Sequence, residues 1–143
     1  MTNAAIVRQL GGAGVVRHPI RTDLDWVEAL RAGLPAEAAE ALIDSGALSS
    51  EELFRIVIPR RTLALRKQRG QPLTADESDR LARVARVFAW AEDTLGASEK
   101  VQRWMRKSNR GLGGQIPLEL LSSEAGARVV EQALGRIAHG IVA

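Results

Sequence analysis

Apolar residues recur along this chain at spacings of three and four, which is the period of an amphipathic α-helix. The first stripe, Leu24, Val27 and Leu30, predicts a helix that begins near Thr22 and ends at Gly33. The same spacing predicts further helices over residues 35–46, 50–57, 60–69, 74–95, 98–105, 117–121 and 124–139. Since only residues 11–20 leave room for a short extended piece, we expect an all-α protein.

The longest predicted helix has the clearest signals. Thr74 is followed three residues later by Glu77, which is the pattern of an N-terminal capping box. Its apolar stripe, with alternating spacings of 3 and 4, consists of Leu81, Val84, Phe88, Ala91 and Leu95. This stripe has to be covered by another surface, either within the chain or from a partner.

Length and composition exclude several classes of protein. A chain of 143 residues can bury its own core, and the absence of cysteine excludes disulfides, thiolate zinc sites and cysteine nucleophiles. No apolar run is long enough to span a membrane, so we expect a soluble protein that does not bind a membrane. The absence of cysteine is compatible with a reducing compartment, and we expect the protein to be cytoplasmic. We expect residues 1–20 to form a flexible arm without an export signal.

Charge is segregated along the chain, although the formal net charge is only +3. Residues 23–52 contain eight acidic side chains, whereas residues 55–69 contain six Lys or Arg and no acid. Such a segment builds an electropositive patch, for which phosphate is the natural complement.

The basic segment coincides with a predicted helix-turn-helix. Residues 50–57 would form the bracing helix, Ile58-Pro59 the turn, and the residues from Arg60 onward the recognition helix that enters the major groove. The candidate DNA-binding residues are Arg60, Arg61, Thr62, Arg66, Lys67 and Arg69. A solvated surface helix with basic side chains is the alternative interpretation of the same composition.

Glycines mark the C-terminal third. Leu112-Gly113-Gly114 together with Pro117 predicts a sharp turn between helices, and Gly126 suggests a close backbone approach near the start of the last helix. A plain helical hairpin would explain these glycines equally well.

Taken together and in this order along the chain, the motifs resemble those of the Xre/MbcA/ParS antitoxins. The resemblance covers roughly residues 34–143 and is most specific from Gly96 onward. The resemblance rests on Leu48-Ser49-Ser50-Glu51-Glu52-Leu53, Pro59-Arg60-Arg61-Thr62-Leu63, Lys100, Trp104, Asn109, Leu112-Gly113-Gly114, Pro117-Leu118-Glu119-Leu120-Leu121, Gly126 and Ile137-Ala138-His139-Gly140. The family often has a glycine in the helix-turn-helix turn, where this chain has Val57-Ile58-Pro59, so the register of groove contacts is open by about one residue.

This resemblance implies an antitoxin of a type II toxin-antitoxin system. Its partner would be a RES-domain toxin that consumes NAD, and its helical domain would bind double-stranded operator DNA and autoregulate the operon. The residues that the resemblance implies for toxin binding are Arg136, His139, Gly140, Ile141, Val142 and Ala143.

We therefore expect an arm over residues 1–20, a helix-turn-helix domain and helical core over 21–95, and a small helical toxin-binding domain over 96–143. Because a helix-turn-helix protein commonly reads two half-sites, we also expect a homodimer within a larger toxin-antitoxin complex. The apolar stripe from Leu81 to Leu95, or Trp104 and its neighbours, would provide the dimer contact.

Two rival functions remain at this point. One is a stand-alone repressor whose C-terminal domain only dimerises. The other is a small enzyme, for which the sequence offers no nucleophile motif and no catalytic residue that we can name. His18 and His139, the only histidines, have no spacing typical of metal ligands, so we expect no metal and no cofactor.

Overall fold

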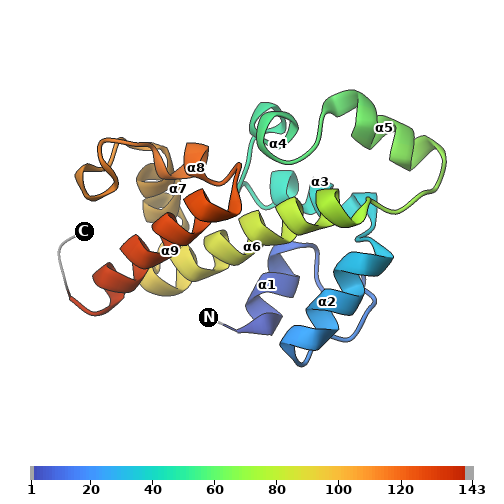
Figure 1. Cartoon of the computed structure of the whole chain (residues 1–143), viewed down its shortest axis with the longest axis horizontal. Helices are drawn as coiled ribbons and strands as arrows, with labels where there is room; N and C mark the ends of the chain where they lie inside the picture. The colour runs from blue at the N-terminus through green and yellow to red at the C-terminus, as the bar shows by residue number, and fades with distance from the viewer. Residues whose placement is uncertain (1, 141–143) are drawn as a thin grey trace.

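A computed structural model describes residues 2–140 of the chain (Figure 1). Within these residues the chain is helical and has no β-strand, so the predicted all-α class is confirmed. The helices are α1 (Asn3–Gln9), α2 (Asp23–Ala32), α3 (Ala36–Asp44), α4 (Ser50–Ile56), α5 (Arg60–Gln68), α6 (Ala75–Leu95), α7 (Ser98–Arg106), α8 (Pro117–Leu120) and α9 (Glu124–Ala138), with a 3-10 turn η1 (Arg110–Leu112).

Helix α6 is the axis of the molecule. Its 21 residues make a rod about 31 Å long, and α9, α1, α7 and α2 all pack against it. Figure 1 shows α1 and α2 on one side of this rod, α4 and α5 on the other, and α7 to α9 around its C-terminal end. One continuous apolar core joins both halves of the chain, across the boundary expected at residue 95.

Side-chain capping boxes fix the starts of α6 and α4. Thr74 and Glu77 form a complete capping box at α6, since each side chain accepts a hydrogen bond from the other residue's backbone N–H. This confirms the predicted start of the longest helix. Ser49 and Glu52 form an equivalent box at the start of α4.

The N-terminal residues differ from the expected flexible arm. Residues 3–9 form α1, whose Ile6 and the following Leu10 are buried against the core. The indole Nε1 of Trp26 donates a hydrogen bond to Asn3 Oδ1 at 3.0 Å, which ties α1 to α2. Residues 11–20 form turns and irregular structure, so the short extended piece considered there is not a strand.

The apolar stripe of α6 is covered within the chain. Leu81, Val84, Phe88 and Ala91 have no exposed surface, because α1, α7 and α9 pack over α6. The expectation that this stripe forms a dimer contact is therefore wrong.

The apolar stripe predicted for residues 22–33, which form α2, is largely exposed. On α2, Leu24 is 65% exposed and Val27 is 40% exposed, and the helix packs inward through Ala29 instead. A stripe shows which residues share a face, but it does not show which neighbour covers that face.

Candidate nucleic-acid interface and partner-binding domain

Helices α4 and α5 form the helix-turn-helix unit. The turn between them contains Val57 and Ile58, which are 2% and 1% exposed and anchor it in the core. The guanidinium Nε of Arg80, on α6, donates a hydrogen bond to the Val57 carbonyl oxygen at 2.8 Å. Buried aliphatic side chains thus anchor this turn, where the resemblance led us to expect a glycine.

The first turn of α5 presents the predicted groove-facing residues. Pro59 is the N-cap residue, Arg60 and Arg61 are exposed, and Thr62 is half-buried. The Arg60 guanidinium carbon lies 5.0 Å from the centre of the Phe54 ring on α4. This cation–π contact orients Arg60 and leaves its charge at the surface.

Two other predicted DNA contacts have partners inside the molecule. Arg66 forms two hydrogen bonds with the carboxylate of Glu77, both at 3.1 Å, and Lys67 Nζ lies 2.8 Å from Glu40 Oε2. Burial acts to raise the pKa of Glu77, but the hydrogen bonds from Arg66 and from the backbone of Thr74 hold this pKa below its usual value. Phosphate would have to compete with these carboxylates for Arg66 and Lys67.

Of the remaining cations in the basic segment, Arg69 is exposed at the C-cap of α5. Arg55 on α4 instead pairs with Glu119 on α8, with Nη2 and Oε1 2.6 Å apart. The electropositive surface is therefore narrower than the sequence indicated, and it is centred on Arg60 and Arg61.

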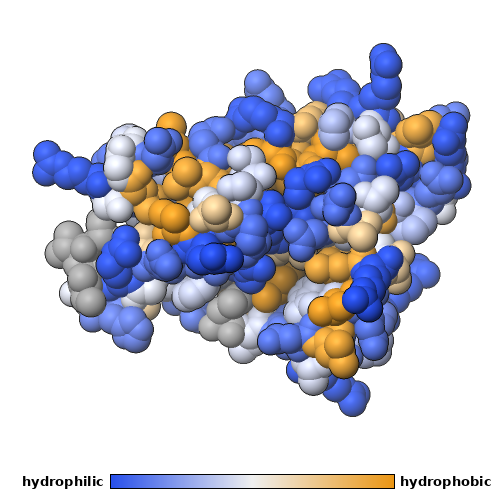
Figure 2. All heavy atoms as spheres, in the orientation of Figure 1, coloured by the Kyte–Doolittle hydropathy of each residue, from blue (hydrophilic) through white to orange (hydrophobic). Residues whose placement is uncertain are grey.

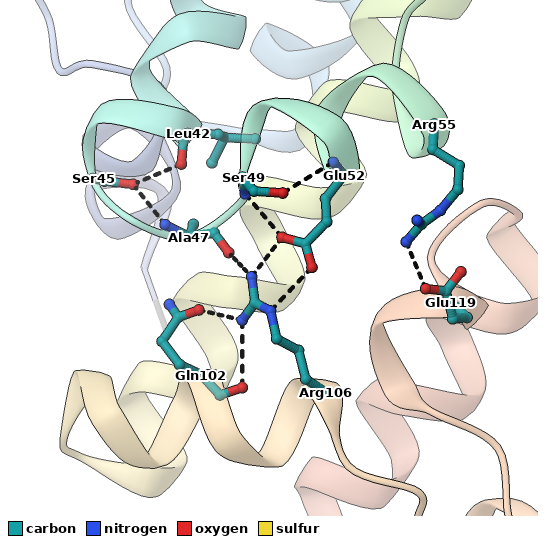
Figure 3. A network of polar contacts seen from close by, with 9 residues as sticks. All are labelled: Leu42, Ser45, Ala47, Ser49, Glu52, Arg55, Gln102, Arg106 and Glu119. Atoms are coloured by element: carbon teal, nitrogen blue, oxygen red, sulfur yellow. Dashed lines mark hydrogen bonds and ion pairs between the residues drawn. The ribbon is translucent and has the colours of Figure 1, made fainter.

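An arginine clamp joins the helix-turn-helix to the C-terminal helices (Figure 3). Arg106, at the end of α7, donates from Nε to Glu52 Oε2 at 3.0 Å and from Nη2 to Glu52 Oε1 at 2.7 Å. Nη2 also donates to the Ala47 carbonyl oxygen at 2.9 Å, and Nη1 donates to the side chain of Gln102. Because Glu52 also caps α4, one carboxylate holds both the helix start and the contact with α7.

Sequence reasoning missed this clamp. Arg106 and Glu52 are 54 residues apart, so no local pattern pairs them. The capping-box signal accounts for Glu52 by itself, and the second role of its carboxylate emerges only when α7 folds back beside α4.

The clamp predicts acid sensitivity. Burial acts to raise the pKa of Glu52, but hydrogen bonds from Arg106 and from the Ser49 backbone lower it below its usual value. The stabilisation is then complete above the pKa of an unfolded glutamate, about 4.3, and declines as pH falls through the lower folded value.

We expect Glu52→Gln to reduce the free energy of unfolding at pH 7 by about 2 kcal/mol, because Arg106 loses a charged partner. The variant should also lose less stability than the wild type between pH 5 and pH 3, as measured by urea unfolding. Glu51→Gln, at the exposed neighbouring position, is the control and should behave like the wild type. Equal pH profiles for the wild type and Glu52→Gln would contradict the assignment.

The sharp turn predicted from Leu112-Gly113-Gly114 is present between α7 and α8. The Asn109 side chain accepts a hydrogen bond from the Gly111 N–H at 2.8 Å, and Gly113 adopts a left-handed conformation with φ of 65°. Gly126 lies in the first turn of α9, against the end of α8, and a Cβ built there would be 1.9 Å from the Leu120 carbonyl oxygen. The predicted close backbone approach is confirmed.

The residues expected to bind a toxin lie at the end of α9. Arg136 is half-buried in its last turn, His139 is the exposed C-cap residue, and Gly140 is exposed. Ile141, Val142 and Ala143 lie outside the described residues. Figure 1 shows this end of α9 at the opposite side of the molecule from α5.

A shallow basic cleft beside α7 is a further candidate site, which was not predicted as a cleft although the resemblance includes Lys100 and Trp104. Lys100, Arg103, Lys107 and Arg110 line it together with the half-buried Trp104. In the sequence, Lys100, Arg103 and Lys107 are spaced at three and four residues around Trp104, which puts them on one side of a helix. Arg110 joins them only because the chain turns after α7.

Residues 2–140 contain no group of three or more His, Asp or Glu side chains arranged to hold a metal ion. None of the helices in this part of the chain combines the length and apolarity needed to cross a bilayer.

Comparisons with known proteins identify both halves of this arrangement. Residues 25–86 match the antitoxin Xre-like helix-turn-helix domain, which includes α4 and α5. Residues 91–140 match the antitoxin Xre/MbcA/ParS C-terminal toxin-binding domain, which includes α7 to α9.

Relatives with curated names agree with these matches. The chain is 41% identical over 108 residues to an antitoxin Xre of Pseudomonas putida, an alignment that covers 76% of this chain and 67% of the relative. It is 36% identical over 115 residues to an antitoxin Xre of Photorhabdus laumondii, covering 79% and 78% of the two chains. A more distant relative, 25% identical over 130 residues and covering 84% and 82%, is the Prs ADP-ribosylating antitoxin of a Sphingobium species. The two domain matches and these relatives, together with an all-helical fold that contains a helix-turn-helix, show that the chain belongs to the Xre family of antitoxins.

Proposed function

We propose that this antitoxin neutralises a RES-domain toxin that consumes NAD, and that its C-terminal residues occlude the toxin's active-site cleft. The match of residues 91–140 to a toxin-binding domain is the observation that carries this proposal. The name of the Sphingobium relative refers to ADP-ribosylation, a reaction for which NAD is the usual donor, and this favours NAD as the toxin's substrate.

The end of α9 is the element that we assign to occlusion. Arg136, His139 and Gly140 stand at the periphery of the molecule, where a partner can approach them without displacing the core. Ile141, Val142 and Ala143 complete this set in the sequence. The basic cleft around Trp104 belongs to the same matched region and would add contacts to the toxin.

DNA binding is the second half of the proposal. Arg60, Arg61 and Thr62 would enter the major groove, and Arg69 would contact a phosphate. Arg66 and Lys67 would contribute only where phosphate replaces Glu77 and Glu40 as their partner. By binding its own operator as a homodimer, the protein would autoregulate its operon in the cytoplasm.

The two surfaces lie at opposite ends of the molecule (Figure 1), so one chain can hold DNA and toxin at the same time. We infer that both activities are binding events and that the chain catalyses no reaction. Turnover of NAD by the purified chain alone would contradict this inference.

Co-expression with the toxin encoded beside it tests the proposal. Removing residues 139–143 should abolish the rescue of growth, because the occluding tail is lost while α9 keeps its packing against α6. Arg61→Ala should rescue growth like the wild type, because it affects only the DNA surface. If the truncated chain rescues growth fully, the tail does not neutralise the toxin; if the wild type fails to rescue, the protein is a repressor without this toxin.

A further inference from the structure

We propose that the outward face of α2 is the surface on which a second copy of this chain packs, in an antiparallel pair of helices related by a two-fold axis. The inference rests on the proposed binding of operator DNA as a homodimer, and it adds the contact. Leu24 and Val27, at 65% and 40% exposure, form the centre of this face. Figure 2 shows apolar residues gathered over α2 at the lower right of the molecule.

Helix α2 is held rigidly with this face outward. Its other side carries the buried Ala29 and the half-buried Trp26 and Leu30, and it packs against α6. A capping box between Thr22 and Asp25 fixes its first turn. Because the backbone is already ordered, a second copy would bury Leu24 and Val27 without an additional cost of ordering the helix.

The charges on this face are complementary to themselves. Asp23 and Arg31 are exposed, and each lies four residues from Val27, one on either side along the helix. Among the described residues, neither of them has an intramolecular ion-pair partner. A two-fold axis at Val27 places Val27 against its own copy and Asp23 opposite Arg31 of the second copy, twice over. Such reciprocal pairing is the signature of an isologous interface.

Other apolar surfaces fit a second copy less well. The stripe on α6 is buried, and Ile116 and Val129, the other exposed large apolar residues in residues 2–140, lie within the matched toxin-binding domain. Helices α2 and α5 lie on opposite sides of α6 but toward the same end of it (Figure 1), and pairing through α2 would bring two recognition helices into one assembly. This arrangement suits an operator with two half-sites about one DNA turn apart.

The contact is small, because ten helical residues extend only about 15 Å. Stable protein interfaces usually bury about 800 Å² on each partner. We therefore expect a monomer–dimer equilibrium that depends on concentration and that a duplex with two half-sites shifts toward the dimer.

Sedimentation velocity of the full chain, alone and with a duplex that covers its own promoter, tests the interface. Leu24→Asp should raise the dimer dissociation constant at least tenfold, and Arg31→Glu should also weaken the dimer. The double exchange Asp23→Arg with Arg31→Glu should restore dimerisation, because the reversed pairs are again complementary. Val129→Asp is the control for adding a charge at an exposed apolar residue, and it should leave the dimer unchanged.

Three results would overturn the interface: a wild type that stays monomeric even on the duplex, a Leu24→Asp variant that dimerises normally, or no recovery in the double exchange. Circular dichroism of each variant verifies that the helices remain folded. Failure of the wild type to bind the duplex at all would instead refute the proposed DNA function. Operator binding by the wild type and Leu24→Asp with the same stoichiometry would refute the α2 contact alone.

Discussion

Gly126→Ala should lower the free energy of unfolding by about 3 kcal/mol, near the upper end of the usual cost of overpacking. The added Cβ would lie 1.9 Å from the carbonyl oxygen of Leu120 and 2.8 Å from its carbonyl carbon. Both are backbone atoms and cannot rotate away, so α8 and the start of α9 would have to separate. That movement would disturb the packing of α9 on α6, which is the most extensive contact between helices in the fold.

Gly135→Ala is the matched control, because Gly135 lies in the same helix and a Cβ built there meets nothing within 4 Å. Alanine is the better helix former by about 1 kcal/mol, so this variant should be at least as stable as the wild type. Urea unfolding of the three proteins gives the comparison. Similar midpoints for Gly126→Ala and the wild type would show that α8 and α9 do not approach as closely as described.

The double variant Arg60→Ala with Arg61→Ala should weaken operator binding by about 2–6 kcal/mol, since each arginine that reads a base contributes about 1–3 kcal/mol. The stability of the fold should change little, because both side chains are exposed. The contact between Arg60 and Phe54 is worth only about 0.5–1 kcal/mol at an exposed site. Fluorescence anisotropy with a labelled operator duplex measures the affinity.

A second double variant, Arg103→Ala with Lys107→Ala, removes the same charge from the cleft beside α7. It should bind the operator like the wild type if α5 alone reads the DNA. An equal loss of affinity in both double variants would indicate a general electrostatic attraction, and α5 would then not be the recognition helix.

Local signals account for most of what could be predicted about the fold. The capping box of Thr74 and Glu77 and the stripe from Leu81 to Leu95 depend on residues within a few turns of one another, and both were read correctly. The start of α5 after Pro59 followed from the same kind of evidence. These features depend only on residues that are close in sequence, so a single sequence is enough to predict them.

Tertiary contacts explain what could not be predicted. Residues 1–20 resembled a loose arm because their glycines break the periodicity, yet Ile6 and Leu10 are buried against the core. Arg66 looked like a DNA contact because its carboxylate partner, Glu77, follows only after the turn into α6. Leu24 and Val27 belong to the predicted apolar stripe of the first helix, yet both are exposed, because a stripe gives no information about which surface covers it.

For the candidate site too, local position could be predicted from the sequence, whereas binding roles could not be tested. Exposure of Arg60 and Arg61 agrees with their expected place at the start of the recognition helix, whereas their contact with bases remains a prediction. The role of residues 136–143 in toxin binding also remains a prediction, supported by the match of residues 91–140 to a toxin-binding domain.

The most direct test of two separate surfaces on one chain is the rate of NAD consumption by the purified partner toxin, titrated with variants of this protein. Arg60→Ala with Arg61→Ala should inhibit the toxin at the same concentration as the wild type, and the chain that lacks residues 139–143 should leave it active. If the truncated chain inhibits fully, or if the arginine variant does not inhibit, the assignment of toxin to the end of α9 and of DNA to α5 is wrong.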